Sequence, residues 1–301
     1  MAALLGSIVL ALTACAPSTG TPVATTPSDA AADRAGTVDV GDGREIYLEC
    51  HGTGTPTVIL VSGLGESADT WNTADPDDAA SPTVYGETAG FTRVCAYDRP
   101  GTGGSRSTEV SQPTSAQISA DDLQLLLTAS GEAGPYVLVG HSYGGPIIRL
   151  FASAHPDEVA GLVLVDALSE DLGAGLTADQ QAAFEALNTP ASSTAESFDY
   201  AALVTQLRGS APVPDVPEIV LTADTPQLTP EVLASGQLPA GVDQQFADAL
   251  WAAQLAAQDL LVEKFAGAEH ITDTRSDHYI QLGNPQLVID SIRDVVDDAR
   301  H

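Results

Sequence analysis

The chain has few basic residues. Only 11 Lys and Arg stand against 41 Asp and Glu in 301 residues, which gives a formal net charge of −30 at pH 7. Proteins that bind nucleic acid or anionic lipid surfaces usually do so through basic patches. The scarcity therefore argues against nucleic acid as a partner and against a membrane contact made through charge. A strongly acidic surface favours solubility without indicating a particular partner.

Cysteine is also scarce, with 3 residues, and neither a Cys-x-x-Cys pair nor a cluster of Cys and His has the spacing of a metal site. We therefore expect neither a metal nor another cofactor. Hydrophobic residues, in contrast, make up 44% of the chain, which is enough for a substantial core. The length suits one large α/β domain or two small ones.

The first residues of the sequence are apolar. Residues 2–12 form an uncharged run that is too short to span a bilayer as a helix, and it leads into Leu12-Thr13-Ala14-Cys15. This pattern resembles the signal of bacterial lipoproteins, and the resemblance implies cleavage after residue 14 and a diacylglyceryl group on Cys15. No Lys or Arg precedes the run, unlike in ordinary export signals, so an upstream start and a plain cleaved signal peptide stay open. We expect export to the bacterial cell envelope with a lipid anchor at Cys15, or otherwise secretion.

Residues 15–36 are rich in Pro, Thr, Ser and Ala, which predicts a flexible tether before a folded domain at 37–301. Within that domain apolar runs alternate with helical patterns, which predicts a doubly wound, mostly parallel sheet with its chemistry at the carboxyl ends of the strands. The predicted strands are 37–40, 44–50, 57–61, 92–97, 136–139, 161–165, 218–221 and 268–272, and the main helices are 115–129, 146–153 and 285–299. Residues 169–215 predict a small helical lid, and residues 225–264 predict an extension of this lid and a packing helix.

One stretch carries a recognisable chemical motif. The residues Gly140-His141-Ser142-Tyr143-Gly144 fit the pattern G-x-S-x-G, with an apolar strand before them and a helical segment after them. This context is what a nucleophile elbow requires, because the serine sits on a sharp turn whose neighbours must lack side chains. Ser142 is therefore the predicted nucleophile. A structural Gly-Ser turn is the alternative.

Several motifs in order resemble the α/β-hydrolase superfamily. They are the oxyanion-loop position at 61–65 (Val-Ser-Gly-Leu-Gly), the Asp-Arg loop at 97–105, the elbow at 139–145, the strand end at 161–167 and the segment Asp277-His278-Tyr279-Ile280. The resemblance implies an eight-stranded sheet with a small helical lid. It also implies that the backbone N–H groups of Leu64 and Tyr143 form the oxyanion hole. Asp98 and Arg99 are expected to brace the oxyanion loop rather than to react.

A serine hydroxyl needs a base, and histidine has the ordinary pKa that suits this task. His278 lies between the last predicted strand and the terminal helix, which resembles the family's position for the base. His270 falls within a predicted strand, where a packed histidine is expected, and His141 lies inside the elbow and is expected to point away from the serine. His278 is therefore the predicted base.

Two carboxylates compete for the third position. Asp166 closes the strand after the nucleophile strand, and Asp224 closes the next strand. Most family members use the later strand, but Thr222 replaces a glycine of that site here and Asp224 comes one place early. We therefore predict Asp166 as the acid that orients His278, with Asp224 as the alternative.

The resemblance extends to the cysteines. The family's strand order places the strands of Cys50 and Cys95 side by side and antiparallel, which implies a Cys50–Cys95 disulfide; reduced, buried cysteines are the alternative. The motifs together predict an exported serine hydrolase that cleaves a small or medium ester-like substrate through an acyl-enzyme. A catalytically silent ligand-binding lipoprotein, a cofactor-free perhydrolase or haloperoxidase, and a peptidase are the other readings of the same fold.

Overall fold

The computed structural model describes residues 32–74, 80–105, 111–190, 192 and 195–301. The predicted signal segment, Cys15 and most of the predicted tether lie outside these residues. The tether was predicted to extend to residue 36, but strand β1 already begins at Arg34. The earlier start arises because Arg34, Ala35 and Gly36 pair in register with the neighbouring strand, opposite Cys50, Glu49 and Leu48.

Eight strands form one sheet in the order β1-β2-β4-β3-β5-β6-β7-β8. Strand β2 runs antiparallel to both of its neighbours, and the other pairs from β4 to β8 are parallel. The predicted doubly wound, mostly parallel sheet is therefore confirmed. The strands are β1 (Arg34–Gly41), β2 (Arg44–His51), β3 (Thr57–Val61), β4 (Val94–Tyr97), β5 (Tyr136–His141), β6 (Val159–Val165), β7 (Glu218–Leu221) and β8 (Glu269–Ile271).

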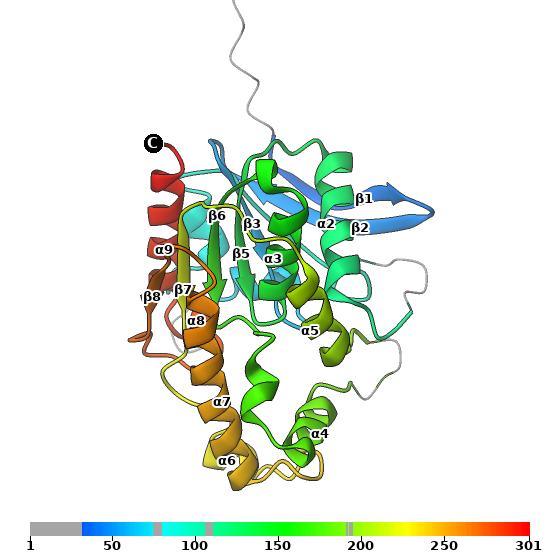
Figure 1. Cartoon of the computed structure of the whole chain (residues 1–301). Coiled ribbons are helices and arrows are strands. Elements are labelled where there is room, and N and C mark those ends of the chain that lie inside the picture. The colour runs from blue at the N-terminus through cyan, green and yellow to red at the C-terminus, as the bar shows by residue number, and fades with distance from the viewer. Residues whose placement is uncertain (1–31, 75–79, 106–110, 191, 193–194) are drawn as a thin grey trace, which may run out of the picture. The chain divides into compact units, whose positions relative to one another are not determined.

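Helices cover both faces of this sheet (Figure 1). Helices α2 (Ala116–Ser130) and α3 (Gly144–Ala154) pack on one face, and α1 (Val84–Thr88) and α9 (Pro285–Asp298) pack on the other. Alternate residues of β3 belong to the two resulting hydrophobic clusters, and every residue of that strand is buried. This explains why β3 reads as a continuous apolar run, since both of its faces are covered.

The longest surface helices have local start and stop signals in the sequence. Helix α2 begins after Ser115, whose side chain accepts a hydrogen bond from the Ile118 N–H, and it ends at Gly131 in the left-handed conformation. Helix α7 (Gln244–Val262) begins after Asp243, which caps the Phe246 N–H in the same way. These caps agree with the helix positions that the sequence predicts.

A further set of helices lies beyond the sheet. Between β6 and β7 the chain forms a 3-10 helix (Leu172–Gly175), α4 (Ala178–Leu187) and α5 (Tyr200–Gly209), and between β7 and β8 it forms α6 (Pro230–Leu233) and α7. Figure 1 shows α4, α6 and α7 gathered at one end of the sheet. Helix α5 instead contacts α2 and α3. We call α4 and α7 the cap helices. Short helices at Ala68–Asn72, Pro156–Glu158 and α8 (Ile280–Gly283) complete the fold, and no helix among the described residues is long and apolar enough to cross a membrane.

Strands β2 and β4 are cross-linked. Cys50 and Cys95 stand opposite each other in the antiparallel register and form a disulfide, which is the pairing that the family resemblance implies. The carboxylate of Glu132 lies close to both sulfur atoms. It is paired with Arg93 at 2.7 Å, and sulfurs joined in a disulfide do not offer thiolate ligands, so this group is not a metal site.

Candidate active site

Ser142 lies at the turn between β5 and α3, with a φ of 50°. A non-glycine residue in this left-handed region is strained, and such residues cluster at functional sites. The glycines on either side permit the turn. A Cβ on Gly140 would lie 2.7 Å from the carbonyl oxygen of Gly144, and a Cβ on Gly144 would collide with the backbone of Val61 in β3. The elbow therefore requires glycine at both positions, as the motif predicts.

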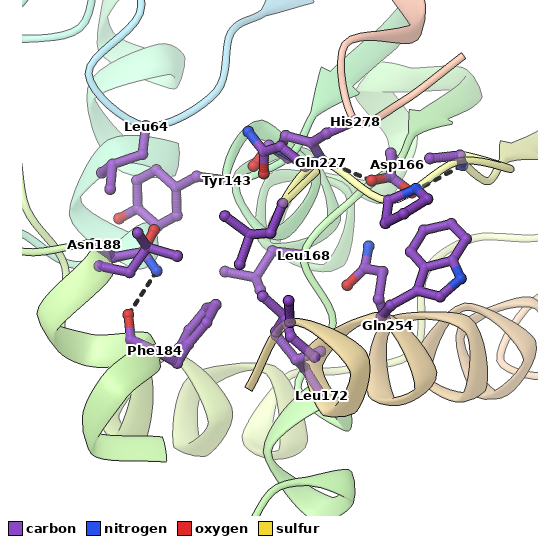
Figure 2. A pocket seen from close by; sticks show the side chains of 18 of the residues that line it. Leu64, Tyr143, Asp166, Leu168, Leu172, Phe184, Asn188, Gln227, Gln254 and His278 are labelled. Carbon is purple, nitrogen blue, oxygen red and sulfur yellow. Dashed lines mark hydrogen bonds and ion pairs between the residues drawn. The ribbon is translucent and has the colours of Figure 1, made fainter. Parts of the chain in front are cut away.

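His278 pairs with Asp166 at the edge of the same pocket. The two side chains meet with a distance of 2.6 Å between His278 Nδ1 and Asp166 Oδ2 (Figure 2). Because the carboxylate accepts, Nδ1 donates, and Nε2 is left as the nitrogen that can take a proton. The other carboxylate oxygen accepts the N–H of Ala223 at 3.0 Å, and the Asp166 side chain is only 3% exposed.

The two partners shift each other's pKa. Burial alone would lower the pKa of His278, but the hydrogen bond and the charge of Asp166 outweigh burial and raise it. Burial alone would raise the pKa of Asp166, but the hydrogen bond with His278 lowers it, and Gln254 of α7 contributes in the same direction. Figure 2 shows Gln254 extending from α7 toward the carboxylate. The pair therefore favours an ionised Asp166 and a basic His278.

Asp224, the alternative acid, has a different place. Its two carboxylate oxygens accept the backbone N–H groups of Arg275 at 2.8 Å and Ser276 at 3.0 Å. These two residues immediately precede the segment that carries His278. The structure therefore places Asp166 against the ring of His278. It places Asp224 against the backbone that precedes His278.

The competing histidines lie elsewhere. His270 is in β8, where its Nε2 is 2.9 Å from the hydroxyl of Thr222. His141 is fully buried, and its ring contacts Glu66 and the backbone carbonyl of His278 rather than the pocket. Of the histidines in the described part of the chain, His278 alone lines the pocket that contains Ser142.

The loop after β3 is held on both sides of Leu64. Arg99 donates to the carbonyl oxygens of Ser62, at 2.8 Å, and Gly63, and the N–H of Gly65 donates to Glu196 at 2.7 Å. Leu64 itself lines the pocket together with Tyr143, the other predicted oxyanion residue. Arg99 thus braces the loop, which is the role that the sequence resemblance assigns to it.

Asp98 has a matching role one residue earlier. Its carboxylate accepts the N–H of Ala68 at 2.7 Å and the N–H of Gly104, so it joins the loop after β3 to the loop after β4. A Cβ on Gly103 would collide with this carboxylate, which explains a glycine in the Asp-Arg loop.

Two carboxylates of the site were missed by sequence reasoning. Glu196 forms a buried ion pair with Arg99 at 2.6 Å, and Glu66 accepts hydrogen bonds from Gly63 and His141. Burial alone would lower the pKa of Arg99, but Glu196 raises it above its ordinary value. Glu196 lies in an Ala-rich, motif-free insertion and Glu66 lies just past a motif, so no local signal marks either residue.

The pocket above Ser142 has a volume of about 120 Å³. Its walls come from the strand ends and from both cap helices (Figure 2). Among the described residues, Asp166 and His278 are the only ionisable groups besides Tyr143 that line it. The apolar walls are formed by Leu64, Leu168, Leu172, Phe184, Leu187, Phe198, Leu228, Ala247, Leu250 and Trp251.

This fold and this site agree with the comparison with known families. The family model described as the alpha/beta hydrolase fold matches residues 56–267. The chain belongs to the α/β-hydrolase family.

Individual relatives share parts of the chain. An uncharacterized protein of Schizosaccharomyces pombe is 35% identical over 140 residues, which cover 40% of this chain and 26% of that protein. A putative carbamate hydrolase of Azorhizobium caulinodans is 33% identical over 126 residues, covering 42% of each. This chain therefore spans less than half the length of these two relatives. The structure of a thermophilic esterase from Thermogutta terrifontis aligns with a TM-score of 0.54 at 18% identity, covering 90% of this chain and all of that one, and shows the likeness of the fold.

The positions of Asp166 and Asp224 lead to a test of the two carboxylates. We expect Asp166→Asn to lower kcat on an activated ester by about 10,000-fold, because the amide oxygen stays with the Ala223 N–H and the NH2 group then faces Nδ1, which forces the wrong tautomer on the histidine. Asp224→Asn should cost about tenfold or less, since an amide oxygen still accepts one of the two loop N–H groups. Rates measured on both purified variants decide the matter. A larger loss of kcat in Asp224→Asn than in Asp166→Asn would show that Asp224 is the acid.

The raised pKa of His278 sets the pH dependence. A base works only when unprotonated, so kcat/KM should increase with pH through an inflection above the ordinary histidine value of about 6.5. In Asp166→Asn the group that raises the pKa is gone, and the inflection should move to lower pH. A pH profile of kcat/KM on a substrate that does not itself titrate measures both. If the inflection stays at the same pH in Asp166→Asn, a group other than His278 controls the loss of activity at low pH.

Proposed function

We propose that the protein is a serine hydrolase that cleaves a carboxylic ester through an acyl-enzyme. Ser142 attacks the carbonyl carbon while His278 Nε2 takes its proton, and Asp166 stabilises the imidazolium that results. The oxyanion is stabilised by the N–H groups of Leu64 and Tyr143. His278 then protonates the departing alkoxide, and water, deprotonated by the same histidine, releases the acid.

The observation that carries this proposal is the hydrogen-bonded pair of His278 and Asp166 in one pocket with a strained Ser142. The pair leaves Nε2 as the free base, and the elbow presents the hydroxyl to the same cavity. The esterase and the putative carbamate hydrolase among the similar proteins support hydrolysis of an ester-like or carbamate-like bond. Hydrolysis of a carboxylic ester requires only a nucleophile, a base with its acid and an oxyanion hole, so it needs no group beyond those named above.

The walls of the pocket support an uncharged substrate with an apolar part, since the polar residues Asn188, Thr225, Gln227 and Gln254 that line it are neutral. Apart from the proposed triad, no carboxylate, guanidinium or ammonium group among the described residues lines it. Burying a charged substrate group there would carry a desolvation cost that no opposite charge offsets. Leucine, phenylalanine and tryptophan side chains from the cap helices would instead gain from contact with an acyl chain.

Labelling with a fluorophosphonate probe tests the nucleophile. We expect the wild-type chain to bind one probe molecule covalently and Ser142→Ala to bind none, because the serine oxygen forms the bond to phosphorus. Intact-protein mass spectrometry measures the adduct. Folded wild type that neither reacts with the probe nor hydrolyses any ester would indicate a ligand-binding protein that has kept the fold without its chemistry.

A second cavity supports a limit on acyl length. It has a volume of about 400 Å³ and lies between the 3-10 helix at 172–175, α4 and α5. Leu172 and Phe184 line both cavities, so these two side chains form the wall between them. Phe184 is held in place by an edge-to-face contact with Tyr200, whose ring centroid is 5.6 Å away. With this wall in place, the first cavity accepts a short or medium chain.

Removing the wall should change the chain-length preference. We expect Phe184→Ala to raise the ratio of kcat/KM for a decanoate ester to that for a butyrate ester by about tenfold or more, as the two cavities merge. Leu187→Ala is the matched control, because Leu187 lines only the first cavity. Rates on a series of p-nitrophenyl esters measure the effect. Equal profiles in both variants would show that the wall does not set the length.

We also propose that the protein is exported and anchored by a lipid on Cys15. The resemblance of residues 12–15 to a lipoprotein signal supports this, and so does the Cys50–Cys95 disulfide, since disulfides persist mainly in oxidising compartments. A diacylglyceryl group supplies the apolar anchor that an acidic chain cannot supply through charge.

The anchor is tested in a bacterial host with any coding sequence upstream of Met1 retained. Wild type should incorporate an alkyne fatty acid and sediment with the membranes, whereas Cys15→Ser should lose the label because no thiol is left to acylate. Gel fluorescence of the two fractions measures this. An unlabelled wild type in the culture medium would support secretion without an anchor.

A further inference from the structure

His141, inside the elbow, makes two hydrogen bonds although it faces away from the pocket. Its Nε2 lies 3.0 Å from the backbone carbonyl oxygen of His278, and its Nδ1 lies 3.2 Å from Glu66 Oε2. The side chain of His141 is 1% exposed and that of Glu66 16% exposed, so water does not replace these partners readily. The proposed mechanism gives neither residue a role.

The partners fix the orientation of the ring. A carbonyl oxygen only accepts, so Nε2 carries the hydrogen that it donates to His278. Burial alone would raise the pKa of Glu66, but the hydrogen bond and charge of His141 outweigh burial and lower it. The ring of His141 and the carboxylate of Glu66 therefore stabilise each other in this place.

We infer that the hydrogen-bonded pair of His141 and Glu66 positions the catalytic histidine relative to the oxyanion loop. The inference deepens the proposed hydrolase and rests on it for its consequences in catalysis. His141 and Glu66 are positioning residues, since neither lines the pocket.

Three segments meet at this pair. His141 is the last residue of β5 and precedes the nucleophile, Glu66 follows the oxyanion loop, and the carbonyl belongs to His278 itself. Glu66 Oε2 also accepts the N–H of Gly63 at 2.9 Å, next to Leu64. One carboxylate and one ring therefore connect the backbone of the base, the loop of the oxyanion hole and the nucleophile elbow.

The backbone around the pair leaves space for both side chains. A Cβ on Gly63 would lie 2.9 Å from His141 Nδ1 and 3.0 Å from Glu66 Oε2, so only glycine leaves room for the pair at this position of the loop. The rings of His141 and His278 are 4.7 Å apart between centroids. Burial alone would lower the pKa of His278, and the Glu66 carboxylate is one of the charges that raise it.

The hydrogen bond of the His141 ring can be detected without measuring activity. The chain has six histidines, so the full-length protein labelled with nitrogen-15 in the imidazole rings gives a simple spectrum. We expect one slowly exchanging imidazole N–H, because Nε2 of the buried His141 donates to the carbonyl of His278, and we expect this signal to vanish in His141→Gln. A wild-type spectrum without a slowly exchanging imidazole proton would overturn the inference.

The positioning role is tested by kinetics on Glu66 variants. Glu66→Ala should lower kcat by about 10- to 100-fold with KM changed less than about threefold, because the base is misplaced while the pocket is intact. Glu66→Gln should recover part of this loss, since its amide oxygen can take the place of Oε2 and keep the hydrogen bond from Gly63. Glu87→Ala and Glu87→Gln, on the exposed face of α1, are the matched controls.

The outcomes separate the two proposals. If Glu66→Ala folds with unchanged circular dichroism and keeps wild-type kcat, or if Glu66→Gln is as slow as Glu66→Ala, the positioning role is wrong. If wild type itself fails to react with the fluorophosphonate probe, the proposed hydrolase is wrong, and the nitrogen-15 spectrum still decides whether His141 holds the carbonyl of His278.

Discussion

The close approach of the elbow to strand β3 is the constraint on which the site depends. Gly144 sits so near the backbone of Val61 that no side chain fits between them. This contact brings the first turn of α3 beside the loop that carries Leu64. The strained turn at Ser142 is tied to the next strand as well, because its N–H donates to the carbonyl of Val165 at 3.1 Å, one residue before Asp166. Ser142, the loop that carries Leu64 and Asp166 are thus positioned by neighbouring strands of one sheet.

The residues that the sequence motifs single out are those whose signal is local. Ser142 stands in a turn that needs glycines at fixed offsets, and His278 stands in a short segment before the last helix. For the acid, Thr222 in place of the usual glycine favours Asp166, and the hydrogen bonds of Asp166 and Asp224 agree with this reading. Strands and helices were found because buried parallel strands form continuous apolar runs.

What the sequence did not predict depends on distant partners. Glu196 pairs with Arg99 across 97 positions of the chain, and Glu66 pairs with His141 across 75. The local sequence around a carboxylate in an Ala-rich insertion is the same whether its side chain is solvated or paired with a buried guanidinium. Only the folded chain distinguishes the two. The first strand was placed late for a related reason. Arg34 belongs to β1 because β2 pairs with it, not because its own segment has β-strand periodicity.

The few cations of this acidic chain also determine how the pocket is covered. Arg149 of α3 binds Glu170 at 2.7 Å, and Arg99 binds Glu196 at 2.6 Å, with every side chain at most 7% exposed. Removing one partner of such a pair leaves a buried, uncompensated charge and costs about 3 to 5 kcal/mol. The segment from Glu170 to Glu196, which carries α4 and Phe184, is therefore fixed to the body at both ends. Helix α4 therefore lies between two anchors, and separating either ion pair would consume a large part of the protein's stability.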